Sequence, residues 1–213
     1  MIGIREILLM ALPLIFALTV VVGARALVAD RMGDHSARAQ GRLTLNPTPH
    51  IDLIGTVFVP LAVLLASQGR FIFGWPRPLP LQLNACKKPR LAQRYVSLAG
   101  IVTHLAMAIA WALLINLAAL LPKQYAVALV QMCSYGVMFN GFFLFFNLLP
   151  LPPFDMGYLI DSFLGYKAHS KYMTVEPYSF WIVLLLLLTG VLSPLFMAVA
   201  AATNAVASLF IFI

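Results

Sequence analysis

Long stretches without charged side chains dominate the hydrophobic pattern of this chain. A helix needs about 20 consecutive apolar residues to cross a bilayer, and several of these stretches approach or exceed that length. They are Ile7–Ala24, His50–Gly69 (interrupted only by Asp52), Tyr95–Pro122, Gln124–Phe154 and Tyr178–Ile213. The pattern therefore predicts a bundle of membrane helices.

The two ends of the chain need separate treatment. We expect the first stretch to remain in the protein as a helix that runs to about Ala29, although Ala24-Arg25-Ala26 resembles a weak signal-peptide cleavage site. The last stretch would be roughly 54 Å long as one straight helix, which is too long for one crossing. Gly190 and Pro194 mark the expected break, because proline cannot continue an unkinked helix.

Composition excludes several classes of protein. Of the 213 residues, 62% are hydrophobic and only 10% are charged. A soluble fold of this size cannot bury so much apolar surface, so soluble enzymes, nucleic-acid-binding proteins and disordered tails are excluded. The formal charge of +7 then indicates basic loops that face the cytoplasm and anionic lipid. Cys86 and Cys133 form no CxxC motif, and so indicate neither a disulfide framework nor a thiolate metal site.

The charges on either side of the segment 51–68 decide its topology. If this segment crosses the membrane, nine Lys and Arg residues fall on one side and five on the other. If it enters and returns, twelve fall on one side, and only Arg5 and Lys123 on the other. The positive-inside rule favours the second arrangement. We therefore expect a re-entrant element, with the basic region in the cytoplasm.

The predicted fold class is an all-α integral membrane protein, a polytopic helical bundle of about 4–6 membrane helices. A re-entrant or extended insert separates the first and second full spans. We expect a single membrane domain over residues 1–213. Its parts are a first span at 4–29, the insert at 30–95, spans at 96–121 and 124–149, a proline-rich break with Asp155 at 150–166, and a C-terminal span at 178–213 with its break near Pro194.

Four motifs occur in a fixed order along the chain. Residues 41–52 are GRLTLNPTPHID, 74–80 are GWPRPLP, 98–104 are LAGIVTH and 147–157 are NLLPLPPFDMG. Together they resemble the compact bacterial members of the site-2 protease family, which are intramembrane zinc metalloproteases. The resemblance covers about two-thirds of the chain, from Phe16 to Gly157. It implies that the segment with Pro76, Pro78 and Pro80 lies near a substrate groove.

The zinc motif of that family is degenerate in this chain. The family has H-E-x-x-H on its first helix, in which two histidines bind zinc and the glutamate is the general base. An ungapped alignment puts Val21, Val22 and Arg25 at these three positions. Valine has no lone pair to offer a metal, and arginine stays protonated in proteins. The resemblance therefore predicts a pseudoprotease without catalytic residues and without bound zinc.

The third metal ligand of the family is retained as Asp155. Without a metal, this carboxylate would need another counter-charge at membrane depth. We expect an Arg25–Asp155 ion pair to replace the metal as the link between two helices. The alternative is that Arg25, close to the end of its helix, extends its side chain to water.

Four further residues fall at former substrate-groove positions by resemblance. They are His50, His104, Asn140 and Asn147. His104 replaces an asparagine of the family, and His50, His104 and Asp155 could form a new metal site, which we regard as the less favoured interpretation. Asn140 and Asn147 share a helix face, and interhelical hydrogen bonds are the preferred explanation for them. We expect His35 and His169 to be solvated in loops.

Two functions from different classes are consistent with these residues. The first is a non-catalytic membrane protein that binds a transmembrane partner through the former groove, or is a subunit of a larger membrane complex. The alternative is an active intramembrane metalloprotease with a non-standard metal site. The expected location is the bacterial inner membrane, with the lipid bilayer and integral membrane proteins as partners and no nucleic acid. A transporter has little support, because few ionisable residues lie in the predicted spans.

Overall fold

The computed structural model describes residues 4–67 and 72–212, and within these ranges it is helical and contains no β-strand. The α-helices are α1 (Ile4–Met32), α2 (Ser36–Ala39), α3 (Val59–Ala66), α4 (Pro89–Ile115), α5 (Lys123–Asn147), α6 (Asp155–Asp161), α7 (Tyr166–Met173), α8 (Ser179–Leu188) and α9 (Ser193–Ser208). Shorter 3₁₀ elements are η1 (Thr48–His50), η3 (Leu83–Ala85), η4 (Asn116–Leu120) and η5 (Glu176–Tyr178), and η2 (Leu53–Phe58) is a π-helix.

Four segments are long and apolar enough to cross a membrane. They are Ile4–Met32, Pro89–Leu120, Lys123–Asn147 and Tyr166–Leu188. Leu53–Ala66 and Ser193–Ser208 are shorter apolar helices. The predicted fold class, a polytopic all-helical membrane protein, is confirmed by this arrangement.

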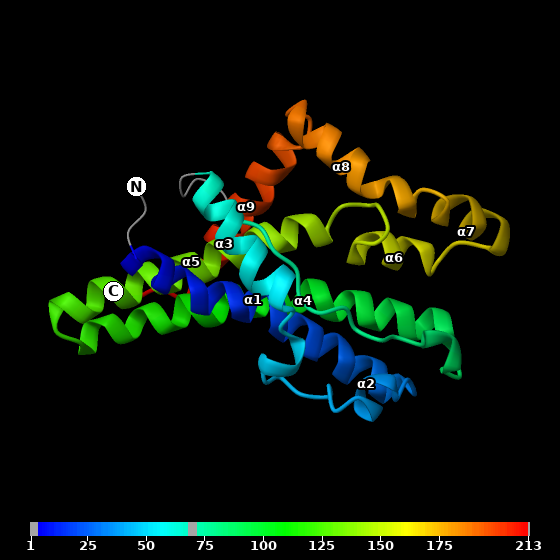
Figure 1. Ribbon diagram of the computed structural model, residues 1–213, viewed down its shortest axis with the longest axis horizontal. Helices are drawn as coiled ribbons and strands as arrows, with labels where there is room; N and C mark the ends of the chain where they lie inside the picture. The colour runs from blue at the N-terminus through cyan, green and yellow to red at the C-terminus, as the bar shows by residue number, and fades with distance from the viewer. Residues whose placement is uncertain (1–3, 68–71, 213) are drawn as a thin grey trace.

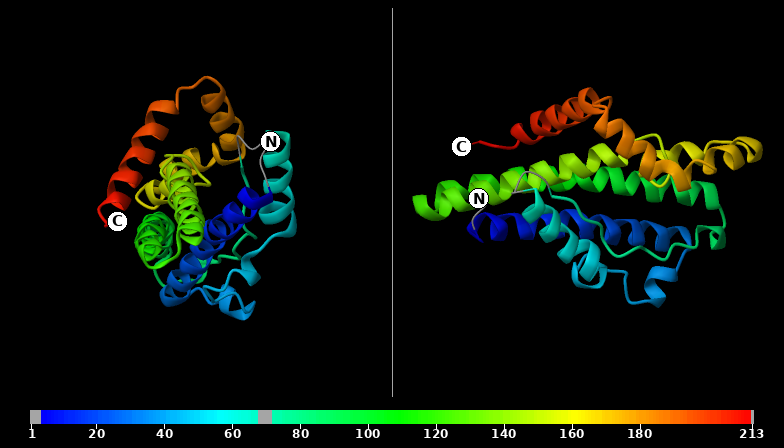
Figure 2. Two further views of the ribbon diagram at one scale, coloured as in Figure 1. Left: turned by 90° about the vertical axis from the view of Figure 1, so that its left-hand side faces the viewer. Right: turned by 45° about the horizontal axis from the view of Figure 1, so that its top comes forward.

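Helices α1, α4 and α5 lie side by side and form the centre of the bundle (Figure 1). One apolar cluster joins α1, α3 and α5 through Leu14, Leu64 and Phe139. A second joins α4, α5 and α9 around Trp111 and Cys133. Consequently, α3 and α9 cover opposite flanks of the three central helices (Figure 2).

The insert between α1 and α4 leaves the bundle end and returns to it. Residues 53–66 form η2 and α3, and together these are too short for a full crossing. After α3, the chain runs back in extended form beside its outgoing path. The amide of Trp75 donates to the carbonyl of Gly55 (2.9 Å), and that of Arg77 to the carbonyl of His50 (2.8 Å). These two bonds hold the proline-rich segment against η1 and η2 of the same insert.

Two helix boundaries depart from the sequence-based expectation. Helix α4 begins at Pro89 rather than at residue 96, because proline fits the first turn of a helix, where its missing N–H is not needed. At the C-terminal end, the candidate span starts at Tyr166 rather than at Tyr178, because the short 3₁₀ turn η5 joins α7 to α8. The chain then turns between Leu188 and Ser193, where Gly190 has a φ of 73° that favours glycine.

Candidate functional site

Arg25 and Asp155 meet where α1, α5 and α6 converge. The Arg25 Nη2 atom donates to Asp155 Oδ2 at 2.5 Å and to Asn147 Oδ1 at 3.0 Å. The side chain of Arg25 is 23% exposed and that of Asp155 is 7% exposed. Burial raises the pKa of the Asp155 carboxyl, and the Arg25 guanidinium opposes that rise. The structure thus brings together one residue of the first helix, one of the third long helix and the aspartate that follows the proline-rich break.

Gly100 on α4 provides the space for this ion pair. A Cβ atom at position 100 would lie 1.8 Å from Asp155 Oδ2 and 2.6 Å from Arg25 Nε. Both distances are far below van der Waals contact, so no side chain fits there without displacing the pair. The carboxylate and the guanidinium therefore pack directly against the backbone of α4.

Val21 and Val22, which the sequence comparison expects at two further positions of the zinc motif, are apolar and buried. Val21 is 4% exposed and Val22 is 3% exposed. Among the described residues, no group of three or more His, Cys, Asp or Glu side chains is arranged to hold a metal ion. In particular, the structure does not assemble His50, His104 and Asp155 into one ligand set. The donors present do not fit the catalytic zinc that the family resemblance implies.

His104 and Asn140 form a second, neutral contact in the core of the bundle. His104 Nδ1 lies 3.1 Å from Asn140 Oδ1, and the ring stacks on Phe143. The Asn140 amide nitrogen also donates to the carbonyl of Gly136 at 2.8 Å. Asn147 behaves similarly, because it donates to the carbonyl of Phe143 at 2.9 Å and accepts from Arg25. Both asparagines therefore link α5 to another helix.

His50 is separate from these groups and belongs to the insert. Its ring is fully buried, and Nε2 lies 2.9 Å from the carbonyl oxygen of Thr44. Burial lowers the pKa of the His50 imidazole. Nearby, the buried Arg42 donates to the carbonyls of Arg77 (2.9 Å) and Pro78 (2.5 Å). These contacts hold the insert together.

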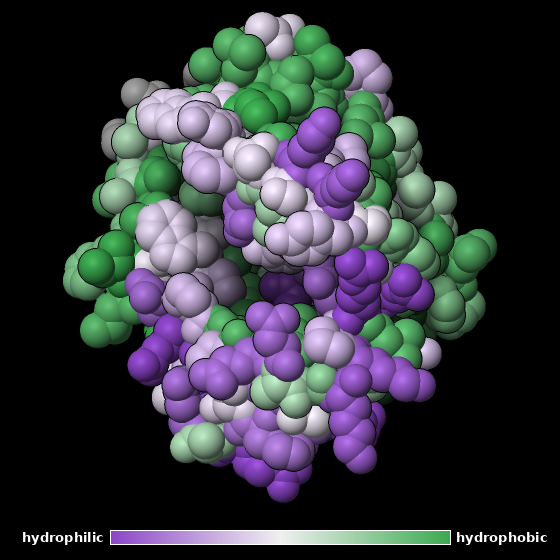
Figure 3. Space-filling model, turned by 90° about the vertical axis from the view of Figure 1, so that its right-hand side faces the viewer, coloured by the Kyte–Doolittle hydropathy of each residue, from purple (hydrophilic) through white to green (hydrophobic). Residues whose placement is uncertain are grey.

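A cavity of about 600 Å³ reaches the Arg25–Asp155 pair from one end of the molecule. Its walls come from the extended segment at Pro78–Leu83, from α4 at Gln93–Ser97, and from α6 and α7. Figure 3 shows this end, where a hollow with hydrophilic residues (purple) at its base opens among residues that range from hydrophilic to hydrophobic. His50, His104, Asn140 and Asn147 are not among the described residues that line the cavity.

Sequence reasoning missed one polar cluster on the cavity wall. His169 lies in α7, not in a loop, and its Nδ1 is 2.6 Å from Asp161 Oδ1. Gln93 of α4 donates to Asp161 Oδ2 at 2.9 Å and to the carbonyl of Tyr158 at 2.8 Å. Its members lie on three helices, so no short motif marks them. The cluster ties α6 and α7 to α4 and fixes the mouth of the cavity.

The cavity combines an extended backbone edge, polar side chains and a paired charge at its base. Nothing among these groups resembles a nucleophile with an adjacent base. Asp155, which we expected at a metal-ligand position of the family, is bonded to Arg25.

Comparison with known proteins identifies a relative that covers most of the chain. Over 184 residues the chain is 37% identical to the "Putative zinc metalloprotease YwhC" of Bacillus subtilis (strain 168). The alignment covers 84% of this chain and 80% of that protein. No family model and no solved structure matches the chain.

Proposed function

The chain belongs to the site-2 protease-like family of zinc metalloproteases, and from this premise we propose that it is a pseudoprotease. It is a non-catalytic integral membrane protein that binds a transmembrane partner or serves as a subunit of a larger membrane complex. We further propose that it lies in the bacterial inner membrane with its basic loops in the cytoplasm, as the charge distribution favours.

One observation carries this proposal. The side chain at the second histidine position of the zinc motif is the guanidinium of Arg25, and it is bonded to Asp155. A guanidinium stays protonated in proteins and has no lone pair for a metal. The Arg25 guanidinium, which cannot bind zinc, also donates a hydrogen bond to an oxygen of Asp155, the retained ligand. Both effects act against a metal at this site.

The general base of the family chemistry is also missing. Val22 stands where the family has its glutamate, and a valine side chain can neither accept nor donate a proton. Activation of a water molecule by a metal and a carboxylate base requires both groups. On this proposal, the chain lacks the groups that the family's mechanism requires to activate water.

The cavity supports a role in binding. It keeps the extended segment at Pro78–Leu83 and a polar base, so a peptide or an unwound helix end could bind there without being cleaved. The Arg25–Asp155 pair takes over the structural task of joining α1 to α6, so the groove keeps its shape without a metal.

Metal content tests the proposal. We expect the full chain, purified in detergent without chelators, to hold far less than one equivalent of zinc by elemental mass spectrometry. A variant with Val21→His, Val22→Glu and Arg25→His should gain zinc, because it restores three missing groups around Asp155. The same variant with Asp155→Ala is the matched control and should bind zinc more weakly.

One equivalent of zinc in the unmodified chain would instead favour the active metalloprotease with a non-standard site. Cleavage of a transmembrane helix by the unmodified chain, abolished by Asp155→Ala, would contradict the proposal directly.

A further inference from the structure

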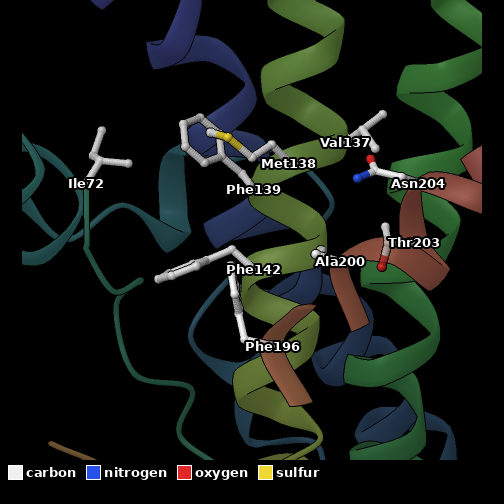
Figure 4. A pocket seen from close by; sticks show the side chains of 10 residues that line it. Ile72, Val137, Met138, Phe139, Phe142, Phe196, Ala200, Thr203 and Asn204 are labelled. Carbon is white, nitrogen blue, oxygen red and sulfur yellow. The ribbon is translucent and has the colours of Figure 1, made fainter. Parts of the chain in front are cut away.

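A groove of about 360 Å³ runs between α5 and α9 on the outer flank of the bundle. Phe142 and Phe196 form one part of its wall, and Val137, Thr203 and Asn204 form another (Figure 4). The groove is lined almost entirely by apolar side chains. Lipid chains can fill an apolar groove, so the groove alone requires no protein partner.

Asn204 places a polar side chain in this otherwise apolar surface. Its side chain is exposed and makes no hydrogen bond with any other residue that the structure describes. The neighbouring Thr203 differs, because its hydroxyl donates to the carbonyl of Val199 at 2.8 Å within the same helix. Asn204 therefore presents an amide with both its donor and its acceptor unused.

The depth of Asn204 makes this unused amide costly. It lines the groove together with Val137, which lies near the middle of the 25-residue helix α5. Since α5 is long and apolar enough to span the membrane, a crossing centred on α5 would place the amide at the level of the hydrocarbon core. A polar group without a hydrogen bond is unfavourable in that environment.

The surface around Asn204 permits a second helix to approach closely. The same exposed face of α9 carries small side chains on both sides of Asn204. They are Ala201 one turn before it, and Ala205 and Ser208 after it. Small residues allow helix backbones to come close in membranes, and asparagine side chains then bond across the interface. No charged residue lies in α9. The exposed face of α8 offers only apolar and aromatic side chains at Phe180, Trp181, Leu185 and Leu188, which lipid can cover.

We propose that α9 binds α9 of a second copy of this chain about a twofold axis close to Asn204. An amide has a donor and an acceptor, so two copies of Asn204 satisfy each other reciprocally. A twofold axis brings identical positions together, which is the geometry that self-complementary groups require. A partner without a polar group at this depth would leave the amide unsatisfied.

Cross-linking in vesicles provides the first test. The full chain with Ala201→Cys, which keeps Asn204, should form a disulfide-linked dimer when it is reconstituted in phosphatidylcholine vesicles and treated with a mild oxidant. The unmodified chain is the background, because Cys86 and Cys133 are buried. Leu188→Cys on α8, which is 78% exposed, is the matched control for random collisions. The dimer should persist as the lipid-to-protein ratio rises.

The strength of the contact provides the second test. Asn204→Leu should weaken self-association, measured by single-molecule photobleaching in the same vesicles, by about 3- to 20-fold, whereas Asn204→Gln should retain most of it. Both substitutions lie on the outer surface, and unchanged melting temperatures would verify that both variants fold. A chain that stays monomeric at every lipid ratio would overturn the proposal. So would equal cross-linking of Leu188→Cys, or equal association of Asn204→Leu.

Discussion

The Arg25–Asp155 and His104–Asn140 contacts of this bundle differ in charge and in access to water. Arg25 and Asp155 form a charged pair at the base of a cavity that opens at one end of the molecule. His104 and Asn140 form a neutral pair that is almost completely buried between α4 and α5. Burial of a charge is far more costly than burial of a hydrogen-bonded amide or imidazole. Of these two contacts, the charged one lies beside the cavity and the neutral one lies in the buried centre.

The largest effect should come from breaking the charged pair. Arg25→Ala leaves the buried Asp155 carboxylate without its counter-charge, and we expect a loss of about 3–5 kcal/mol in the free energy of unfolding. Asp155→Asn in the same chain should restore part of this loss, because the stranded charge is removed. Chemical unfolding in detergent measures both. An Arg25→Ala variant as stable as the original chain would show that the pair contributes nothing.

A smaller effect is expected from crowding the pair without removing it. Gly100→Ala places a Cβ atom where the Asp155 and Arg25 side chains lie, and overpacking of this kind costs about 1–3 kcal/mol. Gly165→Ala is the matched control, because a Cβ there meets nothing within 4 Å. Thermal unfolding should separate the two variants. Equal melting temperatures would mean that the pair moves aside freely.

The neutral pair should be less sensitive. Asn140→Leu removes the partner of His104 Nδ1, and hydrogen bonds between membrane helices contribute about 0.6–1.7 kcal/mol. The double variant with His104→Leu should be no less stable than Asn140→Leu alone, because it removes the unsatisfied ring. A loss from Asn140→Leu as large as that from Arg25→Ala would remove the distinction between the two contacts.

The smallest effect concerns pH at the cavity end. Burial acts to raise the pKa of Asp34, but hydrogen bonds from Ser36 and from the amide of Gln82 outweigh it, so the pKa lies below its ordinary value of 3.8. A depressed pKa contributes stability above pH 3.8 that is lost as the pH falls through the folded value.

Asp34→Asn should therefore flatten the fall in melting temperature between about pH 6 and about pH 3. The bond from the Gln82 amide to Asp34 Oδ2, at 2.6 Å, holds the extended wall of the cavity, so the neutral variant should also loosen this segment in hydrogen exchange. Identical pH profiles for the two chains would contradict this assignment.

The helical membrane fold could be predicted because its signal is local. Charge-free stretches and proline positions are visible in any short window, and helices α1, α4 and α5 start and end within several residues of the predicted spans. The fusion of α7 with α8 was missed, since Lys167 and Lys171 made that region look like a loop. A helix that reaches beyond the hydrocarbon core can carry such charges.

The site depends on contacts between distant residues, and a single sequence does not contain that information. The Arg25–Asp155 contact was proposed only because a family resemblance suggested which helices face each other. The contacts of Gln93 with Asp161, and of Arg42 with Pro78, have no such precedent in the motifs. Gly100 was visible in its motif, but only the packing of α4 against the pair explains why that position has no side chain.

The ion pair joins residues that the ribosome makes at different times. Arg25 precedes Asp155 by 130 residues. At a synthesis rate of about 5–20 residues per second, the first helix waits roughly 7–26 s before its partner leaves the ribosome. During that interval, the guanidinium has no carboxylate to bind and must reach the aqueous surface, as its position seven residues before the end of α1 allows. The Arg25–Asp155 contact can therefore form only after most of the chain has been synthesised.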